Sequence, residues 1–171
     1  MLKPMLLAFA GVLAAGAAAA QTGAQTPAAV TSELHNAAGQ SVGTVTVTEA
    51  PKGVLLRIQI KGISPGWHGV HFHEKGDCSK SDFTSAGGHV HMATPATHGL
   101  LNPAANDLGD LPNIHADDGG AATAELFSAL VTLKMLRDAD GSAVVVHANP
   151  DDYMSQPIGG AGPRVACAVI K

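Results

Sequence analysis

The chain has 171 residues, and its 14 acidic side chains outnumber its 10 lysines and arginines, giving a formal net charge of −4 at pH 7. The basic residues form no run, which argues against nucleic acid and anionic membrane surfaces as partners. Beyond the N-terminus, no stretch approaches the roughly 20 apolar residues that a membrane span needs. A length of this order suits one domain with a substantial core.

The N-terminus has the pattern of a secretory signal peptide. Lys3 supplies a positive charge, residues 6–15 form a short apolar stretch, and residues 18–20 are small alanines. We expect cleavage between Ala20 and Gln21, which would remove residues 1–20 and export the mature chain.

Residues 21–29 are small and polar and are predicted to form a flexible tail, which leaves 30–171 as a single folded domain. Short β-type runs dominate that domain. Residues 42–48 alternate valine with threonine or glycine, and residues 54–60 continue the pattern after Pro51, so the two runs predict a β-hairpin. Further strands are predicted at 30–35, 67–74, 121–127, 130–136, 142–147 and 164–170.

The run 130–136 is ambiguous, because its periodicity also fits a helix. Residues 76–118 and 148–163 lack a regular pattern and are rich in glycine, proline and aspartate. Segments this long inside a compact domain are usually functional loops that other bonds hold in place. About eight short strands without a long helix predict an all-β sandwich or barrel with two long functional loops.

Two histidines, His71 and His73, lie two residues apart in the predicted strand 67–74. Side chains at i and i+2 leave the same face of a strand, so both can bind one metal ion. Taken alone, the pair also fits histidines that only form hydrogen bonds. Imidazole is a common ligand of copper and zinc, however, and the chain is rich in histidine. Five more follow: His89, His91, His98, His115 and His147.

The long segment 76–118 holds a second group of histidines and carboxylates within about twenty residues, the donor types that a tetrahedral zinc ion prefers. They are His89, His91, His98, Asp107 and Asp110. A polar surface loop is the alternative interpretation, and Asp110 also suits a turn. His147 ends a strand where it can complete a copper site, and Asp151 can orient a ligand histidine.

The two cysteines, Cys78 and Cys167, lie far apart in a chain that is predicted to be exported. An oxidising compartment favours one intramolecular disulfide between them, with two buried thiols as the alternative. In the chain-entropy model, closing so long a loop stabilises a fold by about 4 to 5 kcal/mol.

Six motifs in this order resemble the Cu/Zn superoxide dismutase family, in its exported bacterial branch. They cover nearly all of residues 30–171 and together are far more specific than any one of them. The motifs are Gly66–Glu74, Gly76–Cys78, Ser85–His89, Leu108–Pro112, Val145–His147 and Gly162–Cys167.

The resemblance implies a flattened eight-stranded Greek-key β-barrel and the dismutation of superoxide to oxygen and hydrogen peroxide in the periplasm. It implies copper bound by His71, His73, His89 and His147. It implies zinc bound by His89, His98, Asp110 and one further ligand, with His89 bridging the two metals. Arg164 would dock the superoxide anion, Asp151 would link the two sites, and Cys78 and Cys167 would form the disulfide. His68 matches a histidine that bonds the backbone.

One position departs from the family pattern. Three residues before Asp110, where the family usually has its third zinc histidine, this chain has Asp107. We expect Asp107 to complete the zinc site because it keeps the register, with His91 as the rival ligand.

Two other functions stay open from the sequence. One is a copper- or zinc-binding protein without catalysis, which would not need Arg164. The other is a copper-only dismutase, which would leave His98 and Asp110 without a role. The motifs do not decide whether the protein forms a homodimer.

Overall fold

The computed structural model describes residues 26–171, so the predicted signal peptide lies outside the described residues. Nine strands lie within the described range: β1 (Ala29–Asn36), β2 (Ser41–Ala50), β3 (Gly53–Lys61), β4 (Gly66–His68), β5 (Val70–His73), β6 (Ile114–Ala116), β7 (Ala121–Ser128), β8 (Ser142–His147) and β9 (Arg164–Ile170). A 3₁₀ helix, η1 (Thr84–Ala86), and one turn of α-helix, α1 (Leu133–Leu136), complete the regular structure.

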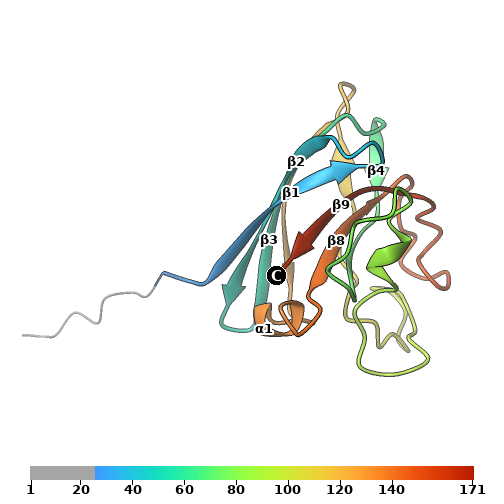
Figure 1. The fold of residues 1–171 in the computed structure, drawn as a ribbon. Helices are drawn as coiled ribbons and strands as arrows, with labels where there is room; N and C mark the ends of the chain where they lie inside the picture. The colour runs from blue at the N-terminus through green and yellow to red at the C-terminus, as the bar shows by residue number, and fades with distance from the viewer. Residues whose placement is uncertain (1–25) are drawn as a thin grey trace, which may run out of the picture.

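Seven strands form one curled antiparallel sheet in the order β5-β8-β9-β1-β2-β3-β7, and β4 pairs with β6 in a second, smaller sheet (Figure 1). The predicted hairpin is the β2–β3 pair, whose register ends at Ala50 and Gly53. The alternation follows burial, because Leu56 and Ile58 enter the core while Arg57 between them is exposed. The all-β prediction is confirmed.

The structure resolves one ambiguity in favour of the helical alternative and corrects one local prediction. Residues 130–136 do not form a strand: α1 covers the second half, and the Thr132 hydroxyl accepts a hydrogen bond from the Met135 amide as an N-cap. Leu133 and Leu136, one helical turn apart, are both buried. The predicted strand 67–74 is split into β4 and β5 at Gly69, where an added Cβ would lie 2.9 Å from that of Ala161.

The two long loops lie together on one side of the sheet, beside β8 and β9 (Figure 1). The first runs from β5 to β6 and the second, residues 148–163, from β8 to β9. They are joined by hydrogen bonds: the His98 amide donates to the Gln156 side chain at 2.9 Å, and the Leu101 amide to the Tyr153 carbonyl at 3.2 Å. Across residues 26–171, no helix is long and apolar enough to span a membrane.

Candidate metal centre

Strand β5 presents two different faces. Val70 and Phe72 pack into the main hydrophobic core, so the alternation of a strand turns His71 and His73 to the opposite face, under the long loops. Both histidines are fully buried. The H-x-H pair therefore points away from the apolar core and into a site that the loops cover.

Four histidines converge there, and one ring nitrogen of each lies within 4.8 Å of the others. They are His71, His73, His89 and His147. Their backbones are fixed by sheet pairing, because β5 pairs with β8, and His73 bridges to His89 in the first long loop. We call this group the four-histidine cluster.

Each member of the four-histidine cluster uses one ring nitrogen in a hydrogen bond and leaves the other buried without a partner. His71 Nε2 bonds the Asp151 carboxylate at 2.9 Å, while His73 Nδ1 and His147 Nδ1 donate to the carbonyls of Gly87 and Gly162, both at 3.0 Å. The unpartnered atoms are His71 Nδ1, His73 Nε2, His89 Nε2 and His147 Nε2. Buried polar atoms without partners are costly, and a copper ion among them would satisfy all four.

A mixed cluster lies on the other side of His89 and contains His98, Asp107 and Asp110, all buried. His89 Nδ1 lies 2.7 Å from an Asp107 oxygen and 3.4 Å from an Asp110 oxygen. His98 Nδ1 lies 2.6 Å from Asp110 and 3.8 Å from Asp107. Two imidazole nitrogens and two carboxylate oxygens thus face a common point, a donor set that suits zinc.

His71 also lies close to this cluster. One ligand atom each from His71, His89, His98 and Asp110 lies within 4.8 Å of the others, and Asp107 is not in that group. His71 enters because its ring centre is only 4.0 Å from that of His89. Its Nε2 is already bonded to Asp151 and its Nδ1 belongs to the four-histidine cluster. We therefore favour Asp107 as the fourth member of the mixed cluster.

The two clusters differ in proton affinity. Burial lowers the pKa of His73 to about 2 and that of His147 to about 3, and the positive charge of Arg164 acts in the same direction. Burial also lowers the pKa of His71, to about 4, although its hydrogen bond to Asp151 opposes the shift. These three imidazoles are neutral at pH 7, the state in which they bind a metal.

In the mixed cluster, burial favours neutral histidine, but the neighbouring carboxylates outweigh it. Hydrogen bonds to Asp107 and Asp110 raise the pKa of His89, and the same two residues, with Asp151, raise the pKa of His98 to about 11. Burial acts to raise the pKa values of Asp107 and Asp110, yet their hydrogen bonds to the two histidines lower both. The two histidines and two carboxylates of this cluster therefore form ion pairs.

Asp151 joins the two clusters. One carboxylate oxygen bonds His71 Nε2 at 2.9 Å and the other bonds His98 Nε2 at 3.0 Å. The Asn113 side chain bonds the Asp151 backbone at both its amide and its carbonyl, each at 2.9 Å. Asn113 has no signal in the sequence, because an asparagine that orients a backbone segment has no recognisable spacing.

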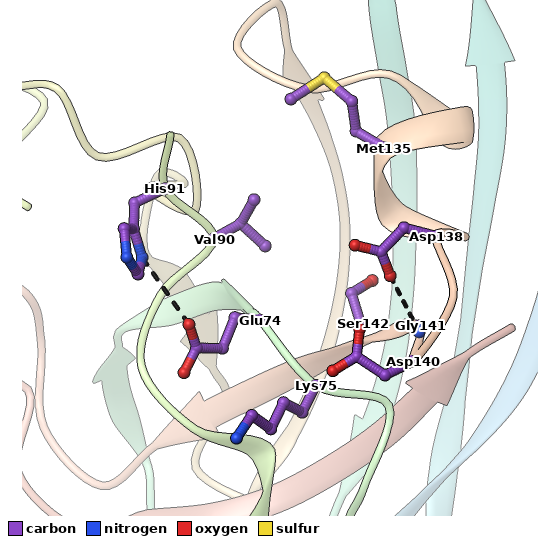
Figure 2. A pocket seen from close by; sticks show the side chains of 9 residues that line it. All are labelled: Glu74, Lys75, Val90, His91, Met135, Asp138, Asp140, Gly141 and Ser142. Carbon is purple, nitrogen blue, oxygen red and sulfur yellow. Dashed lines mark hydrogen bonds and ion pairs between the residues drawn. The ribbon is translucent and has the colours of Figure 1, made fainter. Parts of the chain in front are cut away.

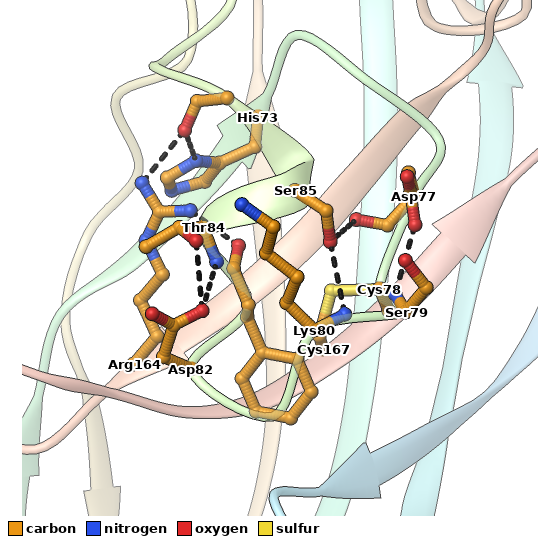
Figure 3. The surroundings of a disulfide bond; sticks show 12 residues. His73, Asp77, Cys78, Ser79, Lys80, Asp82, Thr84, Ser85, Arg164 and Cys167 are labelled. Atoms are coloured by element: carbon orange, nitrogen blue, oxygen red, sulfur yellow. Dashed lines mark hydrogen bonds between the residues drawn. A yellow bond between two sulfur atoms is a disulfide. The ribbon is translucent and has the colours of Figure 1, made fainter.

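Arg164 begins β9 directly across from His147, the last residue of β8. Its guanidinium donates to the backbone carbonyls of Phe83 and Gly87, and the Gly87 carbonyl also accepts from His73 (Figure 3). Both carbonyls lie in the loop that carries Cys78, whose disulfide with Cys167 is present as predicted. The disulfide thus anchors the loop that orients Arg164 toward the four-histidine cluster.

A cavity of about 290 Å³ opens onto both clusters; its lining includes His73, His89, Asp107 and Arg164. A second cavity, of about 280 Å³, lies between Arg164 and His147. A small anion can therefore reach the guanidinium and the four-histidine cluster together. Desolvation lowers the pKa of Arg164, and Asp82 opposes the shift.

Two further histidines have other roles. His68 bonds the backbone, with Nδ1 at 2.7 Å from the His147 carbonyl and Nε2 at 2.8 Å from the Ser64 carbonyl, which confirms its predicted structural role. His91 Nδ1 bonds the His89 carbonyl at 2.8 Å. Its ring faces Glu74 in a third cavity, of about 270 Å³ (Figure 2), and His91 also lines the cavity that opens onto both clusters.

Comparison with known proteins agrees with this geometry. The family model of copper/zinc superoxide dismutase (SODC) matches residues 41–170. The chain belongs to the copper/zinc superoxide dismutase family. The copper-zinc superoxide dismutase of Caulobacter vibrioides is 66% identical over 139 residues, which cover 78% of this chain and 80% of that relative. That of Escherichia coli K12 is 38% identical over 142 residues, with the same two coverages. The family predicted from the sequence motifs is confirmed.

Solved structures of the family share the fold. Cu/Zn superoxide dismutase from Brucella abortus matches with a TM-score of 0.71 at 28% identity, covering 84% of this chain and 100% of that one. A double mutant of a superoxide dismutase-like protein from Bacillus subtilis matches with a TM-score of 0.76 at 34% identity. The match covers 82% of this chain and 95% of that one. Since the fold also occurs in a protein described only as dismutase-like, the activity is assigned from the residues of the site and not from the fold.

Proposed function

We propose that this protein dismutates superoxide outside the cytoplasm, with copper in the four-histidine cluster and zinc in the mixed cluster. It is an oxidoreductase whose cofactors are copper and zinc. When bound, copper supplies one-electron chemistry, oxidising one superoxide to O₂ and reducing the next to H₂O₂, while zinc supplies fixed positive charge. The observation that carries the proposal is the set of unpartnered buried nitrogens facing one another beside Arg164.

Arg164 binds the substrate in this proposal. Superoxide is a small anion, and a guanidinium offers a permanent charge and several donors in one plane. Two backbone carbonyls fix the orientation of the Arg164 side chain, so its position does not depend on a mobile carboxylate partner. Because the chain as a whole is acidic, this local positive charge is needed to draw an anion into the cavity.

His89 has the position of the bridging residue. Its Nε2 belongs to the four-histidine cluster and its Nδ1 to the mixed cluster, and both it and Arg164 line the same cavity. Forming H₂O₂ from superoxide requires protons, and imidazole is the side chain suited to hold one at Nε2 near neutral pH. His89 is therefore the proposed proton donor to the product.

The proposed location is the periplasm. It is supported by the signal-peptide pattern of residues 1–20, and it agrees with the Cys78–Cys167 disulfide, since such bonds persist in oxidising compartments. We propose that residues 30–171 form the mature domain. The disulfide joins residues 89 positions apart, and in the chain-entropy model it stabilises the fold by about 4 to 5 kcal/mol.

The test is the decay of a superoxide pulse in the presence of the mature protein loaded with copper and zinc. We expect fast decay that requires copper and that slows by roughly tenfold or more in Arg164→Ala, because the anion loses its docking charge. Arg57→Ala, which removes an exposed arginine on β3, is the matched control and should decay at the wild-type rate.

One result would overturn the enzyme assignment. If the wild-type protein retains copper and yet decay is no faster than in buffer, the protein is a metal-binding module on the same fold. Equal rates for Arg164→Ala and wild type would instead keep the enzyme assignment and show that Arg164 does not bind the substrate.

A further inference from the structure

The cavity between Arg164 and His147 carries one side-chain charge of each sign. Its lining contains a single cation, Arg164, and a single carboxylate, Asp82, because His147 is neutral at pH 7. The guanidinium attracts an anion that enters the cavity, as substrate docking requires. The carboxylate repels the same anion, so it affects which anions bind there.

The Asp82 carboxylate is fixed in its position. One of its oxygens, Oδ1, accepts the Thr84 amide at 3.0 Å and the Thr84 hydroxyl at 2.8 Å (Figure 3). These hydrogen bonds lower the pKa of Asp82, so the group is ionised at neutral pH. Asp82 also precedes Phe83, whose carbonyl accepts from Arg164, which keeps the negative charge beside the guanidinium.

Asp82 weakens the positive field of Arg164 without cancelling it. The guanidinium donates to the carbonyls of Phe83 and Gly87, and Asp82 stabilises its charged form through space. Asp82 is exposed, so water and dissolved salt reduce the effect of its charge. The carboxylate therefore makes a modest change to the field that an incoming anion meets.

A modest change in field acts unequally on anions of different charge. The Coulomb energy of an anion is proportional to its charge, so a field that weakens the binding of a monovalent anion by some factor weakens that of a divalent anion by the square of that factor. Superoxide carries one negative charge, whereas sulfate carries two. A carboxylate beside the docking arginine therefore disfavours divalent anions more than it disfavours the substrate.

We propose that Asp82 is a specificity-determining residue, which keeps divalent anions away from Arg164 and leaves the docking site to monovalent superoxide. This rests on the proposed function, in which Arg164 docks the substrate. Asp82 thus lowers the rate of superoxide capture and raises the selectivity of the site.

The experiment uses the mature protein loaded with copper and zinc, at constant low ionic strength. Azide, a monovalent anion that gives an absorption band when it binds Cu²⁺, reports on the cavity without turnover, and sulfate is added as its competitor. In Asp82→Asn, which keeps an acceptor for Thr84, we expect azide to bind about twofold and sulfate about fourfold more tightly than in wild type. Superoxide decay without sulfate should be about twofold faster. In about 0.5 M salt these gains should disappear.

Asp77→Asn is the matched control. Asp77 lies in the same loop, and its carboxylate likewise accepts the amide two residues on, that of Ser79 at 2.8 Å, but it does not line the cavity. Azide and sulfate should bind to this variant as they do to wild type. Asp82→Ser removes the charge without adding an amide donor and should match Asp82→Asn. It also provides a test if Asp82→Asn does not fold.

Equal gains in azide and sulfate affinity, or no gain in either, would overturn the proposal. Weaker azide binding in both Asp82 variants would also overturn it, because Asp82 would then serve to orient Arg164. A gain of the same size in Asp77→Asn would assign the effect to net charge alone. Failure of the proposed function gives a different result, in which wild type binds copper and azide but does not accelerate superoxide decay.

Discussion

The four-histidine cluster and the mixed cluster are both buried and share His89, yet burial has opposite outcomes in them. In the first, desolvation dominates and the pKa values of His71, His73 and His147 fall. In the second, carboxylates dominate and the pKa values of His89 and His98 rise. The number of carboxylates in contact decides the outcome: two or more raise the pKa of His89 and His98, whereas the single bond to Asp151 does not outweigh desolvation at His71.

The difference has a consequence for metal loading. Three of the four histidines in the four-histidine cluster are already neutral at pH 7, so a metal competes with protons there only at the shared His89. The metal-free mixed cluster holds protons in its ion pairs, and a metal must displace them. Loading of the mixed cluster should therefore release protons and depend more strongly on pH near neutrality.

The largest effect should come from acidifying the metal-free protein. Because the folded pKa values of His71, His73 and His147 lie at about 4, 2 and 3, below the ordinary histidine value of 6.5, the unfolded chain binds more protons between pH 6.5 and about 4. Stability is then present above pH 6.5 and lost as the pH falls, by up to about 4 kcal/mol per pH unit for three groups. Urea midpoints between pH 7 and pH 4 measure this loss.

His98 does not offset the loss of folding stability at low pH. Its raised pKa contributes stability that is fully present below pH 6.5 and is lost only as the pH rises toward about 11. His147→Gln, which removes one of the three neutral histidines, should reduce the acid slope by about a third. A flat urea midpoint between pH 7 and pH 5 would show that the four-histidine cluster is open to protons in the folded state.

The next effect concerns the link between the clusters. Asp151→Asn replaces two acceptor oxygens by one acceptor and one donor, so only one of the bonds to His71 and His98 can persist. Residues that orient metal ligands usually change affinity by about 10- to 100-fold when mutated, and we expect zinc affinity to fall within that range. Competition with a zinc chelator measures it.

Asp152→Asn is the matched control, since Asp152 is the exposed neighbour of Asp151 and caps a turn with Ser155. It should leave zinc affinity unchanged. If Asp151→Asn behaves like this control, the two clusters are positioned independently and Asp151 only fills space between them.

The sequence predicts the elements that follow from local pattern. The β2–β3 hairpin is visible in the alternation of valine with threonine, and the H-x-H pair in β5 follows from the period of a strand. The convergence of His98, Asp107 and Asp110 on His89 is different in kind. It depends on how an irregular loop folds back, which spacing does not encode. The residue types indicated a group of candidate zinc donors in this loop, and the resemblance to a family was needed to predict which of them share a site.

Other features have no signal in side-chain identity. Arg164 is oriented by the carbonyls of Phe83 and Gly87, and any residue type supplies a carbonyl. The break at Gly69 reflects the close approach of Ala161, a tertiary contact from the second long loop. Tertiary packing likewise decided that residues 133–136 form a helical turn, where periodicity alone fitted either structure.

The smallest effect should come from His91→Ala, which compares the two candidates for the fourth zinc ligand. His91 lines the cavity that opens onto both clusters, but its Nδ1 bonds the His89 carbonyl and its ring faces Glu74. Its loss therefore removes one hydrogen bond and none of the four donors of the mixed cluster. We expect zinc affinity to change by less than about threefold. The corresponding free energy is smaller than the roughly 1 kcal/mol that a typical hydrogen bond contributes. Asp107→Ala, measured in parallel with the same chelator, should lower zinc affinity markedly because a donor is lost. If His91→Ala caused the larger loss, His91 would replace Asp107 as the zinc ligand, and the mixed cluster would contain three imidazoles and one carboxylate.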